Sequence, residues 1–235
     1  MRMFIILLFV FISVSSFAAR PFATYYFEGV ANNLVGTSAS HTFTTGIKSK
    51  TTDYYIFTKY EWADTNGKNL PFSYTLDGNS IGAGVRVWMW KNTAFIGTSY
   101  SSITSGKNKN KPDFRIGGAV YRSWEKPGSF DDWYAELFYV QRADNTLATS
   151  RWRDGVIITQ TRDGKLWSYY VTQISASAVG KNAAENRIES GGGIGYTFDK
   201  NRVSANLELR SGYIFAGKVT KHLYLNPQFV ISGSF

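Results

Sequence analysis

Charged side chains recur at alternate positions in several segments of this 235-residue chain. Arg151 and Arg153 are two residues apart, and so are Glu208 and Arg210. Because successive side chains of an extended strand point to opposite faces, the members of each pair share one face. Such a face can offer fixed positive charge to an anion, or it can hold arginines and carboxylates in ion pairs.

The residues between the charges indicate that strands position them. From Val203 to Phe215 one face is largely apolar, while the alternate residues include Asn206, Glu208 and Arg210. The C-terminal stretch from Leu223 to Phe235 has the same two-faced pattern. In a soluble sandwich the apolar face would pack inward, whereas in a membrane barrel it would meet lipid.

Two features favour the membrane barrel. The two-faced segments are nearer a dozen residues than the five or six that are typical of soluble sheets. Aromatic residues recur near the predicted strand ends, as the interfacial girdles of membrane barrels require; they include Trp62, Trp88, Trp90, Trp124, Trp133, Trp152 and Tyr213.

We therefore predict an all-β fold, a closed antiparallel transmembrane β-barrel of twelve strands. Eight or ten strands would result if some of the segments are loops. The predicted strands cover residues 22–34, 40–49, 53–64, 80–90, 93–103, 113–124, 132–143, 150–160, 165–178, 187–198, 202–216 and 223–235. Asp154 falls on the apolar parity of its strand, which indicates a β-bulge or a register error nearby. The join at Lys126–Gly128 is expected to be long.

The first residues predict export. Arg2 precedes an apolar run from Met3 to Val14, and small residues at Ser16 and Ala18 fit a signal-peptidase site. We predict a signal peptide at 1–18, with the barrel at 19–235. The net charge is +9, with 26 Lys and Arg against 17 Asp and Glu. Export argues against a nucleic-acid partner and leaves lipopolysaccharide, acidic sugars and small anions.

If the apolar parity faces outward, the charged parity lines the lumen. The predicted pore-lining residues are Lys59, Glu61, Arg86, Arg115, Glu136, Arg142, Arg151, Arg153, Arg187, Glu189, Arg202, Glu208 and Arg210. The arginine surplus favours a channel for an anionic or sugar-like solute. The alternative is a closed interior, in which the same arginines pair with the glutamates and the barrel serves as a structural protein or a receptor for surface ligands or phage.

Catalysis has little support in the sequence, and we predict that the chain is not an enzyme. There are two histidines, His41 and His222, and no catalytic or metal-binding motif accompanies them. A lipid hydrolase using Ser40 and His41 at the rim is the weakest of the functional hypotheses. We predict no metal and no cofactor. The run Gly191–Gly195 lacks the helix and lysine of a phosphate loop, so we expect strand glycines that permit close packing.

The segment from Ser105 to Pro112 is a basic loop. Its lysines are Lys107, Lys109 and Lys111. They could bind lipopolysaccharide phosphates, or they could be solvated without binding a ligand.

The last strand carries a resemblance. A C-terminal amphipathic strand that ends in Phe resembles the assembly signal of bacterial outer-membrane β-barrels. Here the signal comprises Phe229, Ile231, Gly233 and Phe235. The resemblance implies a location in the outer membrane, with its lipid and lipopolysaccharide, and insertion by the barrel-assembly machinery.

The middle of the chain has a narrower resemblance. The segment from Asp131 to Val140, the segment from Arg151 to Thr161 and the Gly-rich stretch from Glu189 to Phe198 are together similar to the C-terminal barrels of exopolysaccharide-secretion and phage-adsorption outer-membrane proteins. Those proteins carry a periplasmic helical-repeat region that has no counterpart here. The resemblance implies a stand-alone barrel that works with separate periplasmic polysaccharide-export proteins.

Overall fold

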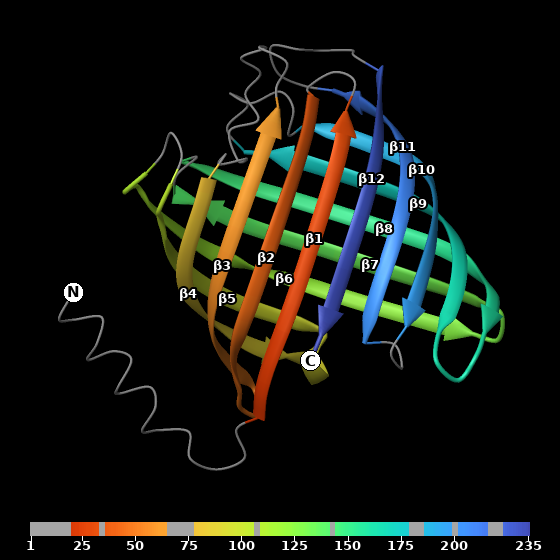
Figure 1. Cartoon of the computed structure of the whole chain (residues 1–235), viewed down its shortest axis with the longest axis horizontal. Coiled ribbons are helices and arrows are strands. Elements are labelled where there is room, and N and C mark those ends of the chain that lie inside the picture. The colour runs from red at the N-terminus through yellow and green to blue at the C-terminus, as the bar shows by residue number, and fades with distance from the viewer. Residues whose placement is uncertain are drawn as a thin grey trace.

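The chain folds into one closed antiparallel β-barrel (Figure 1), as the computed structural model shows. The structure describes residues 20–32, 36–64, 78–105, 109–141, 144–178, 186–198, 202–215 and 223–235. The predicted signal peptide at 1–18 lies outside the described residues. Among those residues, no helix has the length and apolarity that crossing a membrane requires.

Twelve strands follow one another around the barrel, and β12 closes the sheet by pairing with β1. Their bounds are β1 Arg20–Asn32, β2 Gly36–Lys48, β3 Thr52–Asp64, β4 Gly78–Met89, β5 Ala94–Ile103, β6 Pro112–Lys126, β7 Ser129–Val140, β8 Asn145–Gln160, β9 Lys165–Ser177, β10 Arg187–Phe198, β11 Val203–Ile214 and β12 Leu223–Ser234. A short 3-10 helix, η1 Trp90–Asn92, joins β4 to β5. The predicted fold class and strand number are confirmed.

Alternation of the side chains divides the strands into two faces. The outward positions carry exposed apolar side chains, including Ile56, Ile81, Ile96, Ile116, Leu137, Val156, Ile194, Leu207 and Leu225. The inward positions carry most of the charged and amide side chains, and many of these are buried although they are polar. The chain is therefore inverted relative to a soluble protein, with its apolar side chains outside.

Two local predictions were wrong. β8 begins at Asn145 instead of 150, because β7 turns back directly after Val140. The join between β6 and β7 is the two-residue turn Pro127–Gly128, where Gly128 adopts a φ of 79° that favours glycine. The irregularity predicted near Asp154 is present in β8 as a register shift between Ile157 and Thr159, and Asp154 itself stays on the outward face.

The seam between the first and last strands is closed by backbone hydrogen bonds. The Phe235 amide donates to the Ala23 carbonyl (2.8 Å), and the Ala23 amide donates to the Phe235 carbonyl (3.0 Å). Phe229, Ile231 and Gly233 pair with the outward residues Gly29, Phe27 and Tyr25 of β1. The four residues of the predicted assembly signal thus lie along the seam, and their role in assembly stays a prediction.

Candidate functional site

The inner face of the barrel holds most of the predicted pore-lining residues. Lys59, Glu61, Arg86, Arg115, Glu136, Arg151, Arg153, Arg187, Glu189, Glu208 and Arg210 all occupy inward positions of their strands. Arg202 does not: it is exposed in the turn before β11, because that strand begins one residue later than predicted. Arg142 lies outside the described residues.

Glu189 of β10 is the most deeply enclosed charge, with 1% of its surface exposed. Tyr224 and Asn226 of β12 each donate to its Oε1 at 2.7 Å. Arg187 Nε lies 3.5 Å from the same oxygen, and Arg210 Nη1 lies 3.4 Å from Oε2. A carboxylate removed from water in this way is stable only because cations and donors replace its hydration.

Arg210 of β11 links Glu189 to the neighbouring carboxylate. Its guanidinium makes an ion pair with Glu208, to which Nε also donates at 2.7 Å. Nη1 donates to Gln173 Oε1 of β9 at 3.0 Å. Only 3% of Arg210 is exposed, so its planar fork is fully engaged within the wall of the barrel.

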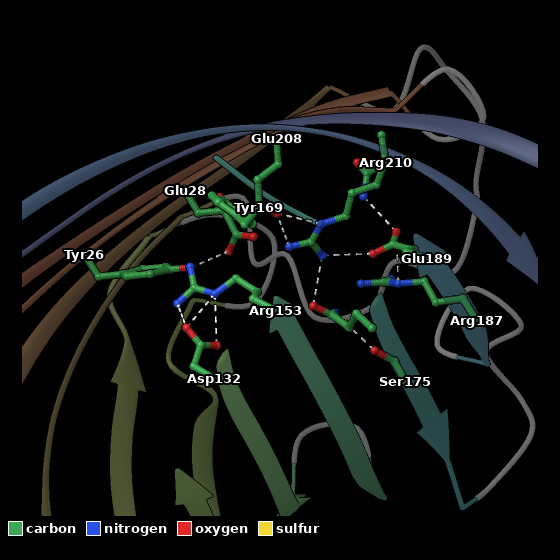
Figure 2. Close-up of polar contacts among 12 residues, drawn as sticks. Tyr26, Glu28, Asp132, Arg153, Tyr169, Ser175, Arg187, Glu189, Glu208 and Arg210 are labelled. Carbon is green, nitrogen blue, oxygen red and sulfur yellow. Dashed lines mark hydrogen bonds and ion pairs between the residues drawn. The ribbon is translucent and has the colours of Figure 1, made fainter. Parts of the chain in front are cut away.

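The same chain of contacts continues to β7 (Figure 2). The Tyr169 hydroxyl donates to Glu208 Oε1 at 2.7 Å, and the Arg153 guanidinium lies over the Tyr169 ring at 5.3 Å. Arg153 in turn binds Asp132, through Nε at 2.9 Å and Nη2 at 2.6 Å to Oδ2. From β7 to β12, the inner wall is therefore a continuous network of paired charges, which we call the locked wall: Asp132, Arg153, Tyr169, Gln173, Arg187, Glu189, Glu208, Arg210, Tyr224 and Asn226.

The inner positions elsewhere are less completely paired. Lys59 pairs with Glu61, and Arg115 Nη2 lies 2.8 Å from Asp113 Oδ2, with about a third of the Arg115 side chain exposed. Arg86 lies over the rings of Tyr55 and Phe95, with centroid distances of 4.3 and 5.5 Å.

Arg151 has similar surroundings. It lies over the Tyr134 ring at 5.7 Å, and its Nε is buried without a hydrogen-bond partner. Within the described part of the chain, neither Arg86 nor Arg151 forms an ion pair. These two half-buried cations are therefore inner charges that are not neutralised by a carboxylate among the described residues.

The aspartates of the inner face were not among the predicted pore-lining residues. Asp53, Asp113 and Asp132 are all buried there. Asp113 and Asp132 have the same parity as Arg115 and Tyr134 two residues later, a signal that could have identified them. Their presence reduces the arginine surplus on which the pore hypothesis was based.

The predicted aromatic girdle also needs one correction. Trp88 is not interfacial: it points inward, and its Nε1 donates to Asp53 Oδ2 at 2.6 Å. Its strand places it on the same parity as Arg86, which the sequence pattern already assigned to the lumen.

Glycines make room for the inward aromatic rings. A Cβ atom built at Gly193 would lie 2.6 Å from Tyr169 Cζ, and one built at Gly82 would lie 2.6 Å from Phe57 Cζ. The ring of one strand thus rests on the bare backbone of the next. The Gly-rich stretch of β10 is a strand that permits close packing, as predicted.

The structure separates the two residues of the hydrolase hypothesis. Ser40 lies opposite Glu61 in the sheet and shares its inward face, whereas His41 is exposed on the outward face. Adjacent strand residues cannot meet at one reaction centre on the same face. His222 lies outside the described residues. Among those that are described, no group of three His, Cys, Asp or Glu residues could hold a metal ion.

The basic loop is described in part. Lys109 and Lys111 are both exposed, and Lys107 lies outside the described residues. The Asn110 amide donates to the Ile103 carbonyl at 2.8 Å, which holds this segment against the end of β5.

Comparison with known proteins gives a general likeness only. No family model matches the chain, and no curated protein matches it. Solved structures that resemble it include a bacterial polysaccharide outer-membrane secretin, with 10% identity over 91% of this chain and 98% of that one (TM-score 0.43).

Two further structural matches are of the same kind. LpxR from Salmonella typhimurium has 8% identity over 88% of this chain and 99% of that one (TM-score 0.47). An outer-membrane channel from Pseudomonas putida F1 has 7% identity over 92% and 95% (TM-score 0.40). The structural neighbours are bacterial outer-membrane β-barrels, and at these values no residue role is carried over from them.

Proposed function

We propose that the chain spans a bacterial outer membrane and that its lumen conducts small anionic or sugar-like solutes. The membrane position is supported by the outward band of exposed apolar side chains on all sides of a closed barrel. The end of the barrel where β1 begins and β12 ends carries short joins, such as Pro127–Gly128 and residues 161–164. Membrane barrels have short periplasmic turns, so we assign this end to the periplasm.

The route for solutes follows from the difference between the two parts of the inner face. On the locked wall, Glu189, Glu208 and Arg210 are almost wholly covered by neighbouring protein atoms, so they are poor surfaces for water or ions. Arg86 and Arg151 keep part of their surface and have no carboxylate partner among the described residues. The proposal is supported by these two cations without a carboxylate partner, because fixed positive charge along a pore lowers the electrostatic barrier to the passage of anions.

A sugar-like solute would meet aromatic rings on the same route. Tyr55 and Phe95 flank Arg86, and the Trp88 and Phe95 rings are 5.1 Å apart. Export of a polysaccharide, with periplasmic partners, is the narrower form of the proposal. It requires the same route.

The test is the reversal potential of the refolded protein in planar bilayers under a salt gradient. We expect a preference for chloride over potassium that falls by about threefold or more when Arg86→Ser and Arg151→Ser are combined, because two fixed positive charges are lost. The matched control combines Arg86→Lys and Arg151→Lys, which keep the charge and should keep the preference. An unchanged preference in the serine variant would exclude these residues as the selectivity determinants.

A structural or receptor barrel is the second candidate. The locked wall favours it, because a network of paired buried charges rigidifies the interior instead of lining a wide pore. An inserted but electrically silent barrel would support this candidate over the channel. That the chain is not an enzyme stays a prediction.

A further inference from the structure

A groove of about 370 Å³ opens on the outer surface of β1 to β4. The side chains that line it include Tyr25, His41, Phe43, Tyr60, Asn79 and Ile81. These six residues occupy outward positions, whereas Lys59 and Ser80, which also line the groove, occupy inward positions of β3 and β4. The groove is therefore formed mainly by the outer face of the barrel. In a membrane-spanning barrel that face meets lipid.

A polar pair lies inside this apolar groove. The Tyr25 hydroxyl is 2.7 Å from His41 Nδ1, and the His41 ring packs against Phe27 at a centroid distance of 4.6 Å. Polar side chains on a lipid-facing surface are costly, and their presence there is a sign of function. When the Tyr25 hydroxyl donates to Nδ1, the neutral imidazole carries its proton on Nε2. His41 is exposed, so this second nitrogen is a donor available to a molecule in the groove.

The rim of the groove leads to the basic loop. Thr104 lines the groove, and its amide donates to the Asn79 carbonyl at 2.8 Å. The Asn79 amide donates to Ser105 Oγ at 2.8 Å, which fixes the start of the segment that carries Lys109 and Lys111. The apolar groove therefore lies close to exposed positive charge on Lys109 and Lys111, at the end of the barrel opposite the one where β1 begins and β12 ends.

We propose that the groove binds lipopolysaccharide through its lipid A anchor. One acyl chain lies along Phe43, Tyr60 and Ile81, and His41 Nε2 donates to the carbonyl of that chain. The phosphate of the sugar headgroup faces Lys109 and Lys111. The inference rests on the proposed membrane position and orientation, which place the groove in the outer leaflet. Charge complementarity selects this lipid, because its phosphates match the basic segment.

The test is the amount of lipid that remains bound to the purified, folded protein after extraction from vesicles. The vesicles contain lipid A and phosphatidylethanolamine in equal amounts, and native mass spectrometry counts both lipids. We expect the wild type to retain lipid A in preference. His41→Phe keeps the ring and removes the donor, and it should lower lipid A retention about fivefold, the equivalent of one hydrogen bond of about 1 kcal/mol.

A second variant tests the groove independently of His41. Ile81→Trp places a larger apolar side chain in the groove and should also lower lipid A retention. Tyr170→Phe is the control, because it removes an outward hydroxyl far from the groove and should leave retention unchanged. Two results would overturn the inference. One is that the wild type and His41→Phe retain equal amounts of lipid A, and the other is that the wild type retains as much phosphatidylethanolamine as lipid A.

The same samples separate this inference from the proposed function. His41, Ile81 and Tyr170 all face outward, so these variants should insert into vesicles and conduct like the wild type. Failure of the wild type to insert would contradict the proposed membrane position. Normal conductance without retention of lipid A would contradict only the proposal that the groove binds lipid A.

Discussion

Replacement of Arg210 by Ala should lower the free energy of unfolding by about 3–5 kcal/mol, the cost of leaving buried charges unpaired. Arg210 is 3% exposed and is shared by Glu189 and Glu208, so its removal leaves two carboxylates without their common cation. Urea unfolding of the barrel in micelles, followed by tryptophan fluorescence, measures the change.

Arg115→Ala is the matched control for this prediction. Arg115 also pairs with an inner carboxylate, Asp113, but about a third of its side chain is exposed. We expect the control to cost clearly less than Arg210→Ala, because water can replace part of the lost pairing. A variant that combines Arg210→Met, Glu189→Gln and Glu208→Gln should recover stability relative to Arg210→Ala, because it removes the three most deeply buried charges of the cluster together. Equal losses in Arg210→Ala and Arg115→Ala would contradict the account of the locked wall.

Replacement of Leu209 by Arg should lower the free energy of unfolding in a bilayer by about 2–4 kcal/mol, the depth-dependent cost of an arginine facing the middle of the membrane. Leu209 lies midway along β11 on the outward face and is 57% exposed. The measurement is folding into vesicles of short-chain lipids over a range of urea concentrations.

The position of the residue along the barrel supplies the control. Leu223 is the first residue of β12, at the rim, and is 80% exposed on the same outward face. We expect Leu223→Arg to cost about 0–1 kcal/mol, as arginines near the interface do. Equal losses of stability in the two variants would contradict the account, because Leu209 and Leu223 would then not lie at different depths in the lipid.

The strands and their faces could be predicted from the sequence because alternation is a local property. A segment such as 203–214 shows its period within a few residues, whatever its neighbours are. Strand ends depend on turns, and those were predicted less well. The tight turn at Pro127–Gly128 and the start of β8 at Asn145 were both missed.

The partners within the lumen could not be predicted, because they depend on the register between strands. Arg153 meets Asp132 because β7 and β8 place these two residues opposite each other. Arg210 meets Glu189 because β11 places it beside Gly191, two residues along β10 from Glu189. The sequence pattern identified which side chains face inward but could not say which arginines are neutralised. The distinction between the locked wall and the free Arg86 and Arg151 required the structure.

Accessibility of single cysteines is the most direct test of the central claim that the outer face meets lipid while the lumen is partly wet. The chain contains no Cys, so every introduced thiol is unique. Ser99→Cys lies inward opposite Arg115, and Ser175→Cys lies inward and buried beside the locked wall. Ser211→Cys lies outward on β11, two residues from Leu209. In proteoliposomes treated with a membrane-impermeant thiol reagent, we predict rapid modification at 99, slow modification at 175 and none at 211. Modification at 211 as fast as at 99 would contradict the account, because the outer face would then be in water.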